Sequence, residues 1–213
     1  MARGRRPVGL FKYDNIEKRD KNFMYLNLKS SNCYNCNFSG SNFDFVSFRG
    51  AHFKKCSFQQ CTFNGAEFIG SNLKESKFKG AQFENTIFEG VNLDGVNFQE
   101  AEFKNTIFVG TDVEKAKNLD HGDPGIRIFD EMPELEISDN LKKAVEDIME
   151  NQFVKKSRVF DTKEGNISPI TIMLLLENFH EESLIKRLEI IKDQIDRDFH
   201  TLSYVIRFLE KAQ

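Results

Sequence analysis

Residues 61–85 read CTFNG AEFIG SNLKE SKFKG AQFEN, which is one pentapeptide pattern written five times. The third residue of each pentapeptide is large and apolar, and the first residue is small. A spacing of five matches neither the 3.6-residue period of an α-helix nor the two-residue period of a strand. The pattern therefore predicts a chain that turns a corner after every fifth residue.

The pattern continues in both directions from this stretch. Nineteen positions in steps of five run from Phe23 to Val113, and fourteen of them are Phe. Four short sides would close a coil of 20 residues, so residues 20 apart would lie one above another at the strand spacing of about 4.8 Å. We predict a four-sided parallel β-helix of about five coils over residues 21–118. Four inward columns would form its core, and the most uniform stacks of rings would be Phe43, Phe63, Phe83 and Phe103, and beside them Phe48, Phe68, Phe88 and Phe108.

The order of a small residue, a polar residue, Phe or Leu and two variable residues resembles the pentapeptide-repeat family, as in AQFEN at 81–85 and SNLKE at 71–75. The resemblance covers nearly half of the chain. It implies an all-β right-handed quadrilateral parallel β-helix, which agrees with the corner geometry. Some members of this family mimic duplex DNA, bind DNA gyrase or topoisomerase IV and protect against quinolones. The resemblance therefore implies a type II topoisomerase as one candidate partner.

The segments on either side of the repeats have another composition. Residues 1–20 are predicted to be an N-terminal cap or tail, and residues 119–137 a linker, because HGDPG at 121–125 favours a loop. From residue 138 the apolar spacing becomes helical, with helix starts marked by Ser138 and by Ser168 before proline. We predict an all-α domain over residues 138–213, with the apolar helix from Pro169 at its centre.

A stripe of apolar residues from Leu184 to Leu209 recurs at steps of three and four. It indicates one long helix or a bent pair of helices. Such a stripe fits packing within the chain, and it equally fits a coiled-coil seam between two copies. The monomer and the homodimer through these helices both remain open at this point.

Four outward positions of the predicted β-helix are apolar where polar residues are the rule: Ile69, Ile87, Ile107 and Val109. All four flank the column of Phe68, Phe88 and Phe108. A contiguous apolar patch normally marks a contact surface. We predict that the C-terminal helices dock on this patch, and the alternative is self-association.

The cysteines and histidines are the candidates for chemistry. Cys33 and Cys36 form a CxxC, followed by Cys56 and Cys61, a set superficially like a four-thiolate zinc site. The repeat register turns all four inward, so we interpret them as core residues. The four histidines, which have no partner at metal-ligand or triad spacing, are His52, His121, His180 and His200. With no phosphate-binding or nucleophile motif either, the sequence predicts a non-enzymatic protein without a metal or cofactor.

The charge is divided unevenly along the chain. Residues 1–19 carry six basic and two acidic groups, residues 20–118 eleven of each, and residues 119–213 thirteen basic and twenty acidic. A neutral β-helix disfavours direct nucleic-acid binding and weakens the hypothesis of DNA mimicry, because a mimic of DNA needs a surplus of carboxylates.

The sequence has no apolar run of the roughly 20 residues needed to cross a bilayer. No secretory signal follows the N-terminal arginines, so we expect a cytoplasmic protein. The sequence favours an interaction scaffold with an unknown partner; the alternative is a binder of gyrase or topoisomerase IV.

Overall fold

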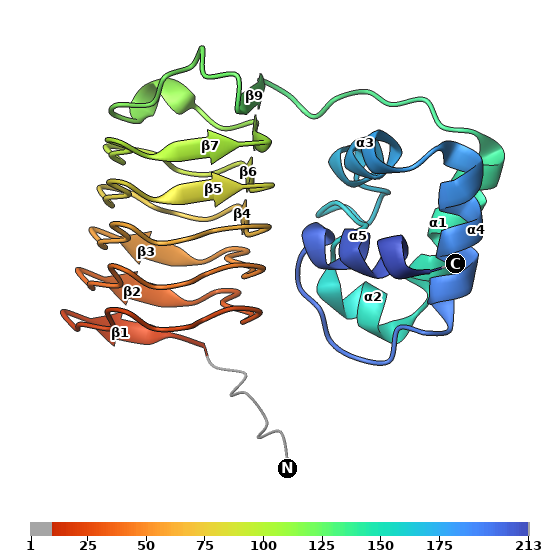
Figure 1. The fold of residues 1–213 in the computed structure, drawn as a ribbon, viewed down its shortest axis with the longest axis horizontal. Coiled ribbons are helices and arrows are strands. Elements are labelled where there is room, and N and C mark those ends of the chain that lie inside the picture. The colour runs from red at the N-terminus through yellow and green to blue at the C-terminus, as the bar shows by residue number, and fades with distance from the viewer. Residues whose placement is uncertain (1–9, 213) are drawn as a thin grey trace. The chain divides into compact units, whose positions relative to one another are not determined.

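The computed structural model describes residues 10–212, which fall into two compact units divided between Asp130 and Glu131. The first unit is a β-helix, and the second is a cluster of helices (Figure 1). Each unit is described by itself below.

Short strands form the sides of the β-helix, and every pair of neighbouring strands is parallel. The register is 20 residues throughout, as in Tyr13 beside Cys33 and Cys33 beside Phe53. The strands are β1 (Lys12–Asp14), β2 (Asn32–Tyr34), β3 (His52–Lys54), β4 (Glu67–Ile69), β5 (Gln82–Glu84), β6 (Ile87–Glu89), β7 (Glu102–Lys104), β8 (Thr106–Val109) and β9 (Ile126–Phe129). The predicted four-sided parallel β-helix is confirmed, and it has about six coils where we expected about five.

The additional coil comes from both ends of the solenoid. At the front, β1 pairs with β2, and Phe11 joins the core, so the coils begin before residue 21. At the back, β9 pairs with β8, so the solenoid also includes part of the segment expected to be a linker. The five-residue pattern of large apolar residues is interrupted at Asn118 and Asp123. Phe108 still pairs with Ile128, 20 residues later, so no residue is inserted in this coil. Between Phe108 and Ile128, a short 3₁₀ helix, Val113–Lys115, and a later loop replace regular sides, while Lys117 still forms a parallel bridge with Asn97.

Stacked Phe rings fill the interior of the β-helix. Within a column the rings are nearly parallel: Phe43 and Phe63 have centroids 5.4 Å apart with 7° between planes, and Phe48 and Phe68 have 4.4 Å and 8°. Small inward residues fix the corners, since the Thr86 hydroxyl donates to the carbonyl oxygen of Phe63 at 2.6 Å. This buried hydroxyl is thus paired inside an apolar core.

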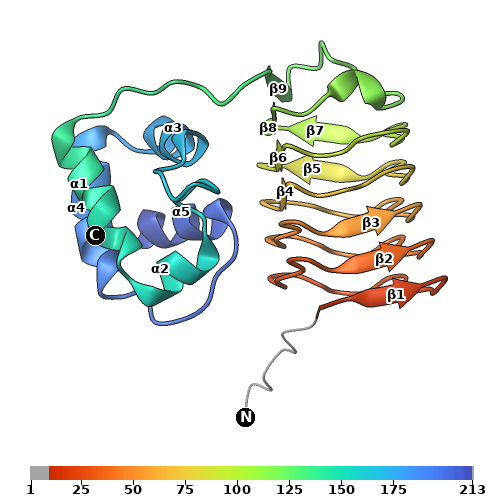
Figure 2. The ribbon, with the colours of Figure 1, turned by 180° about the vertical axis from the view of Figure 1, so that it is seen from behind.

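Five helices make up the second unit: α1 (Asp139–Met149), α2 (Gln152–Ser157), α3 (Pro169–Asn178), α4 (Glu181–Lys192) and α5 (Leu202–Lys211). Figure 2 shows them from behind, with α1 and α4 side by side. Both predicted helix starts are confirmed. The Ser138 hydroxyl accepts from the Leu141 amide at 3.1 Å, and the Ser168 hydroxyl accepts from the Thr171 amide at 3.3 Å.

The apolar stripe from Leu184 to Leu209 belongs to two helices with an irregular connection between them. Helix α4 ends at Lys192, and α5 begins only at Leu202. The connection contains Asp193, Asp196 and Asp198, and aspartate favours caps and turns over helix interiors because its carboxylate competes for backbone amides. Of the two alternatives, one long helix is excluded and a pair of helices is present, and the stripe is not a continuous coiled-coil seam.

Candidate interaction surfaces

The four apolar outward residues of the β-helix lie in two adjacent columns. In the first column Ile87 pairs in register with Ile107. In the second column Glu89 separates Ile69 from Val109. The apolar patch is therefore continuous at Ile87 and Ile107 and is interrupted by a carboxylate beside them.

Strand β9 adds to this patch a residue that the sequence analysis missed. Phe129 stands in register with Val109, one coil further along. The signal was present, because Phe129 lies 20 residues after Val109, but the decay of the five-residue pattern made residues 119–137 resemble a linker. The prediction that the C-terminal helices dock on the patch stays a prediction.

All four cysteine side chains are free thiols buried in the β-helix. The thiols of Cys36, Cys56 and Cys61 donate to backbone carbonyl oxygens, as Cys61 does to Phe38 at 3.2 Å and Cys56 to Cys33 at 3.6 Å. Burial raises the pKa of Cys33 and of Cys61 to about 12, and it raises the pKa of Cys56 as well. A thiol that stays protonated is a poor nucleophile, so these positions act in packing.

The four histidines belong to different segments of the chain. His52 is exposed in β3, and His180 precedes the first residue of α4. The imidazole of His121 lies 3.2 Å from the Glu114 carboxylate, and burial lowers the pKa of His200. Within residues 10–212, no group of three or more His, Cys, Asp or Glu side chains is arranged to hold a metal ion.

Charges on the β-helix surface pair across successive coils. The Lys104 ammonium lies 2.6 Å from the Glu84 carboxylate, and similar pairs join Lys79 to Glu100 at 3.3 Å and Lys55 to Glu75 at 3.7 Å. At these three places a carboxylate of one coil is thus paired with an ammonium group of a neighbouring coil, and no continuous ridge of carboxylates forms there.

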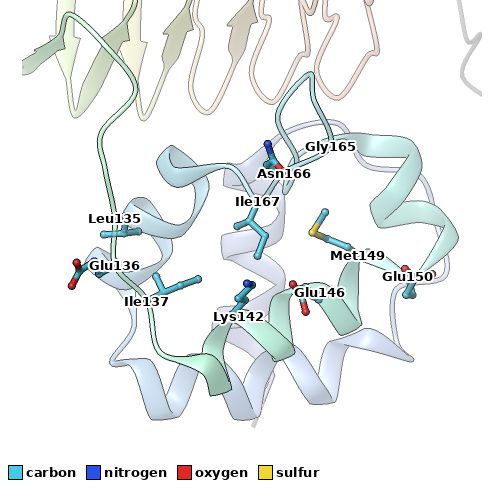
Figure 3. A pocket seen from close by; sticks show the side chains of 10 residues that line it. All are labelled: Leu135, Glu136, Ile137, Lys142, Glu146, Met149, Glu150, Gly165, Asn166 and Ile167. Carbon is cyan, nitrogen blue, oxygen red and sulfur yellow. The ribbon is translucent and has the colours of Figure 1, made fainter.

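The second unit contains an open groove with a volume of about 800 Å³ (Figure 3). Its lining comes from the segment before α1, from one face of α1 and from the loop at residues 165–167. The lining residues are Leu135, Glu136, Ile137, Lys142, Glu146, Met149, Glu150, Gly165, Asn166 and Ile167. The volume falls within the range of about 300–1,000 Å³ that is usual for ligand sites.

The sequence of α1 explains which of its side chains reach the groove. Lys142, Glu146, Met149 and Glu150 are spaced by four, three and one, so they share one face of the helix. An adjoining face of the helix buries Leu141, Val145 and Ile148 in the core. The sequence analysis identified α1 as a helix but missed the groove, because the 165–167 loop joins it only in the folded chain.

Comparisons with known proteins bear on the β-helix. The family model described as "Pentapeptide repeats (9 copies)" matches residues 28–72 and 63–107. No curated protein sequence matches the chain. Among residues 10–212, no helix combines the length and the apolar character needed to cross a membrane.

Several solved structures are similar to this chain. One is HetL from the cyanobacterium Nostoc sp. strain PCC 7120, a pentapeptide-repeat protein involved in the regulation of heterocyst differentiation. It is 20% identical to this chain over 52% of this chain and 48% of HetL, with a TM-score of 0.40. Rfr23 from the cyanobacterium Cyanothece 51142 is 14% identical over 49% of this chain and 85% of its own, with a TM-score of 0.30. Full-length QnrB1, a plasmid-mediated fluoroquinolone resistance protein, is 15% identical over 61% and 85%, with a TM-score of 0.18.

The family match and the register of the coils cover the same residues. The matched residues, 28–107, fall entirely within the stacked coils between β1 and β9. Their large inward residues form the Phe columns that the repeat predicts. The β-helix of this chain therefore consists of the repeats that define the pentapeptide-repeat family.

Proposed function

We propose that this chain is a non-enzymatic scaffold for protein interactions, in which the β-helix is the rigid body and the helical unit carries a binding groove. The observation that supports it most directly is the groove between Leu135 and Ile167. Leu135 keeps 37% of its surface exposed, which is unusual for a large apolar residue in this unit. An apolar side chain left beside an open groove favours a protein or peptide contact.

The β-helix suits the role of a rigid body. Its backbone amides pair between coils at 2.7–3.3 Å, and its interior is filled by ring stacks. Such a solenoid changes shape little when a partner binds, so little ordering entropy is lost on association. The buried thiols, with raised pKa values, suit packing and not catalysis. Their unpaired state also suits the reducing cytoplasm that we propose as the location.

An affinity experiment on the full chain tests the scaffold. Proteins that are retained by the wild type and lost with Leu135→Glu would be partners of the groove. Leu10→Glu is the matched control, because Leu10 is another exposed leucine, with 50% of its surface accessible, at the front of the β-helix. The proposal fails if quantitative mass spectrometry finds no protein that distinguishes the two variants, with circular dichroism confirming that both are folded.

We further propose that the patch of Ile69, Ile87, Ile107 and Val109 is where the chain's own helices dock. The in-register pair of Ile87 and Ile107 supports a contact role, because outward side chains add nothing to the ring stacks inside. The variant Ile87→Lys/Ile107→Lys is expected to lower the melting temperature while the mass by light scattering stays constant. The control variant Gln82→Lys/Glu102→Lys changes two residues with the same pairing on β5 and β7.

Two outcomes would contradict docking within the chain. A fall in mass for the isoleucine variant would show that the patch joins two copies. Unchanged melting and unchanged mass would show that the patch has no contact role in the purified chain.

The second candidate function is binding of gyrase or topoisomerase IV. The resemblance to the family implies it, but the eleven acidic and eleven basic residues of segment 20–118, several paired across coils, do not favour a mimic of DNA. A DNA supercoiling assay separates the readings. Inhibition of gyrase at micromolar or lower concentration would place this reading first.

A further inference from the structure

One wall of the groove is backbone without hydrogen-bond partners. No turn or bend interrupts residues 132–138, which lie outside every helix and strand. Within the described part of the chain, no backbone hydrogen bond involves Leu135, Glu136 or Ile137. Extended backbone with free amides and carbonyls can pair with an incoming strand, as the edge of a sheet does.

The opposite wall is held in place by a tight hairpin. Asp161 and Ile167 form an antiparallel bridge, and the Thr162 amide donates to the Asn166 carbonyl oxygen at 2.8 Å. Ile167 is therefore fixed at the middle of the groove, where Figure 3 shows it between Ile137 and Met149.

The side chains of the groove divide into an apolar and an acidic set. Leu135, Ile137, Met149 and Ile167 form the apolar set. The charged groups are three glutamates, Glu136, Glu146 and Glu150, and one lysine, Lys142. None of the ion pairs found among residues 10–212 involves these glutamates. The net negative charge is thus available to a basic ligand.

We propose that the groove binds a short peptide in extended conformation, in which apolar and basic residues alternate. The backbone of residues 135–137 would pair with the peptide as a strand. Successive side chains of a strand point to opposite sides, so the apolar ones would meet the apolar set, and the basic ones would reach the glutamates. This inference rests on the proposed scaffold function and names the class of its ligand.

The test uses the full chain and a fluorescein-labelled hexapeptide, Lys-Val-Lys-Ile-Lys-Val, with binding followed by fluorescence polarisation. We expect saturable binding that weakens with added salt. Glu146→Gln/Glu150→Gln should weaken binding by roughly fivefold or more, since each exposed charge pair contributes modestly. The matched control, Glu182→Gln/Glu189→Gln, removes the same charge from a second depression of this unit, between α1 and α4, and should leave binding unchanged.

Two further measurements test the mode of binding. The reversed-charge peptide Glu-Val-Glu-Ile-Glu-Val should not bind, and methylation of alternate backbone nitrogens in the basic peptide should remove binding. Hydrogen exchange should slow at the amides of residues 135–137 when the basic peptide is bound. Equal binding of both peptides, or no protection at these amides, would overturn the inference.

The outcomes also separate this inference from the scaffold proposal. If the affinity experiment finds proteins that depend on Leu135 but the hexapeptide does not bind, the ligand class is wrong and the scaffold stands. If a Leu135→Lys variant, which removes the apolar contact and adds a repulsive charge, binds the hexapeptide as well as the wild type does, the groove is not the site and the inference fails.

Discussion

The β-helix and the helical unit bury their apolar residues in different ways. In the β-helix, Phe63 packs between Phe43 and Phe83, the residues 20 positions before and after it, at 5.4 and 5.0 Å. In the helical unit, Leu141 of α1 and Leu184 of α4 are both buried although 43 positions separate them. Residues that pack together are a fixed number of positions apart in the first unit, and they are not in the second. The stability of the β-helix is therefore a sum over neighbouring coils, whereas the helical core is shared by all its helices.

The largest expected effect removes a ring from the middle of a column. Phe63→Ala should lower the free energy of unfolding of the β-helix by roughly 3–5 kcal/mol, because rings on both sides lose their contact and a cavity remains. Phe103→Ala, nearer the end and partly exposed, should cost clearly less. Urea unfolding measures both. Equal losses would show that the coils do not behave as a sum of neighbouring contacts.

A methyl group at Gly125 should destabilise the last coil of the β-helix more than the earlier coils. A Cβ at this position would lie 2.1 Å from the carbonyl oxygen of Phe103, so Gly125→Ala should destabilise the β-helix by about 1–3 kcal/mol. Gly90→Asn is the control, since Gly90 has open space around it and the nearby corners already carry Asn85 and Asn105 at positive φ. Hydrogen exchange should show faster opening of β9 and β8 than of β3 in Gly125→Ala. Protection that changes equally in all coils would contradict this.

A smaller effect is expected in the helical unit at Arg187. Its guanidinium donates to the carbonyl oxygens of Leu209 and Ala212 at 2.6 and 2.5 Å and lies over the Phe179 ring. Arg187→Met keeps the apolar stem and should cost roughly 1.5 kcal/mol by leaving the last carbonyls of α5 without this partner. Calorimetry should show a lower transition for the helices and an unchanged one for the β-helix. Lys186→Met, at an exposed neighbouring position, is the control.

The smallest expected effect is a pH dependence confined to the helical unit. Burial lowers the pKa of His200 below its usual 6.5, with Asp198 opposing the shift and Lys156 adding to it. The unfolded chain therefore takes up a proton first as the pH falls below about 6.5, and the free energy of unfolding decreases until the folded pKa is reached. Urea unfolding at pH 7.5 and at pH 5.5 measures the change in the free energy of unfolding between the two. His200→Asn should make this change smaller, because it removes the contribution of the imidazole. An identical difference in the wild type and the variant would show that other groups carry it.

The comparison also shows why prediction succeeded unevenly. The inward Phe residues and the buried cysteines were predicted because an error of one residue in a period of five would expose a ring. The β9 strand was missed, because Asn118 and Asp123 interrupt the fives while Ile128 keeps the step of 20. The choice between one long helix and a pair of helices was left open, because apolar spacing continues through Ile195 and Phe199 although the backbone there is not helical.

The sequence by itself determined the β-helix, its register and the residues of its core, because each coil repeats the contacts of the previous one. It also determined where α1 and α3 begin, since a capping hydroxyl acts on amides three residues away. The tertiary structure decided the end of the solenoid at β9 and the groove at Leu135, Met149 and Ile167. These depend on contacts between segments at no fixed spacing, and no local pattern encodes such contacts.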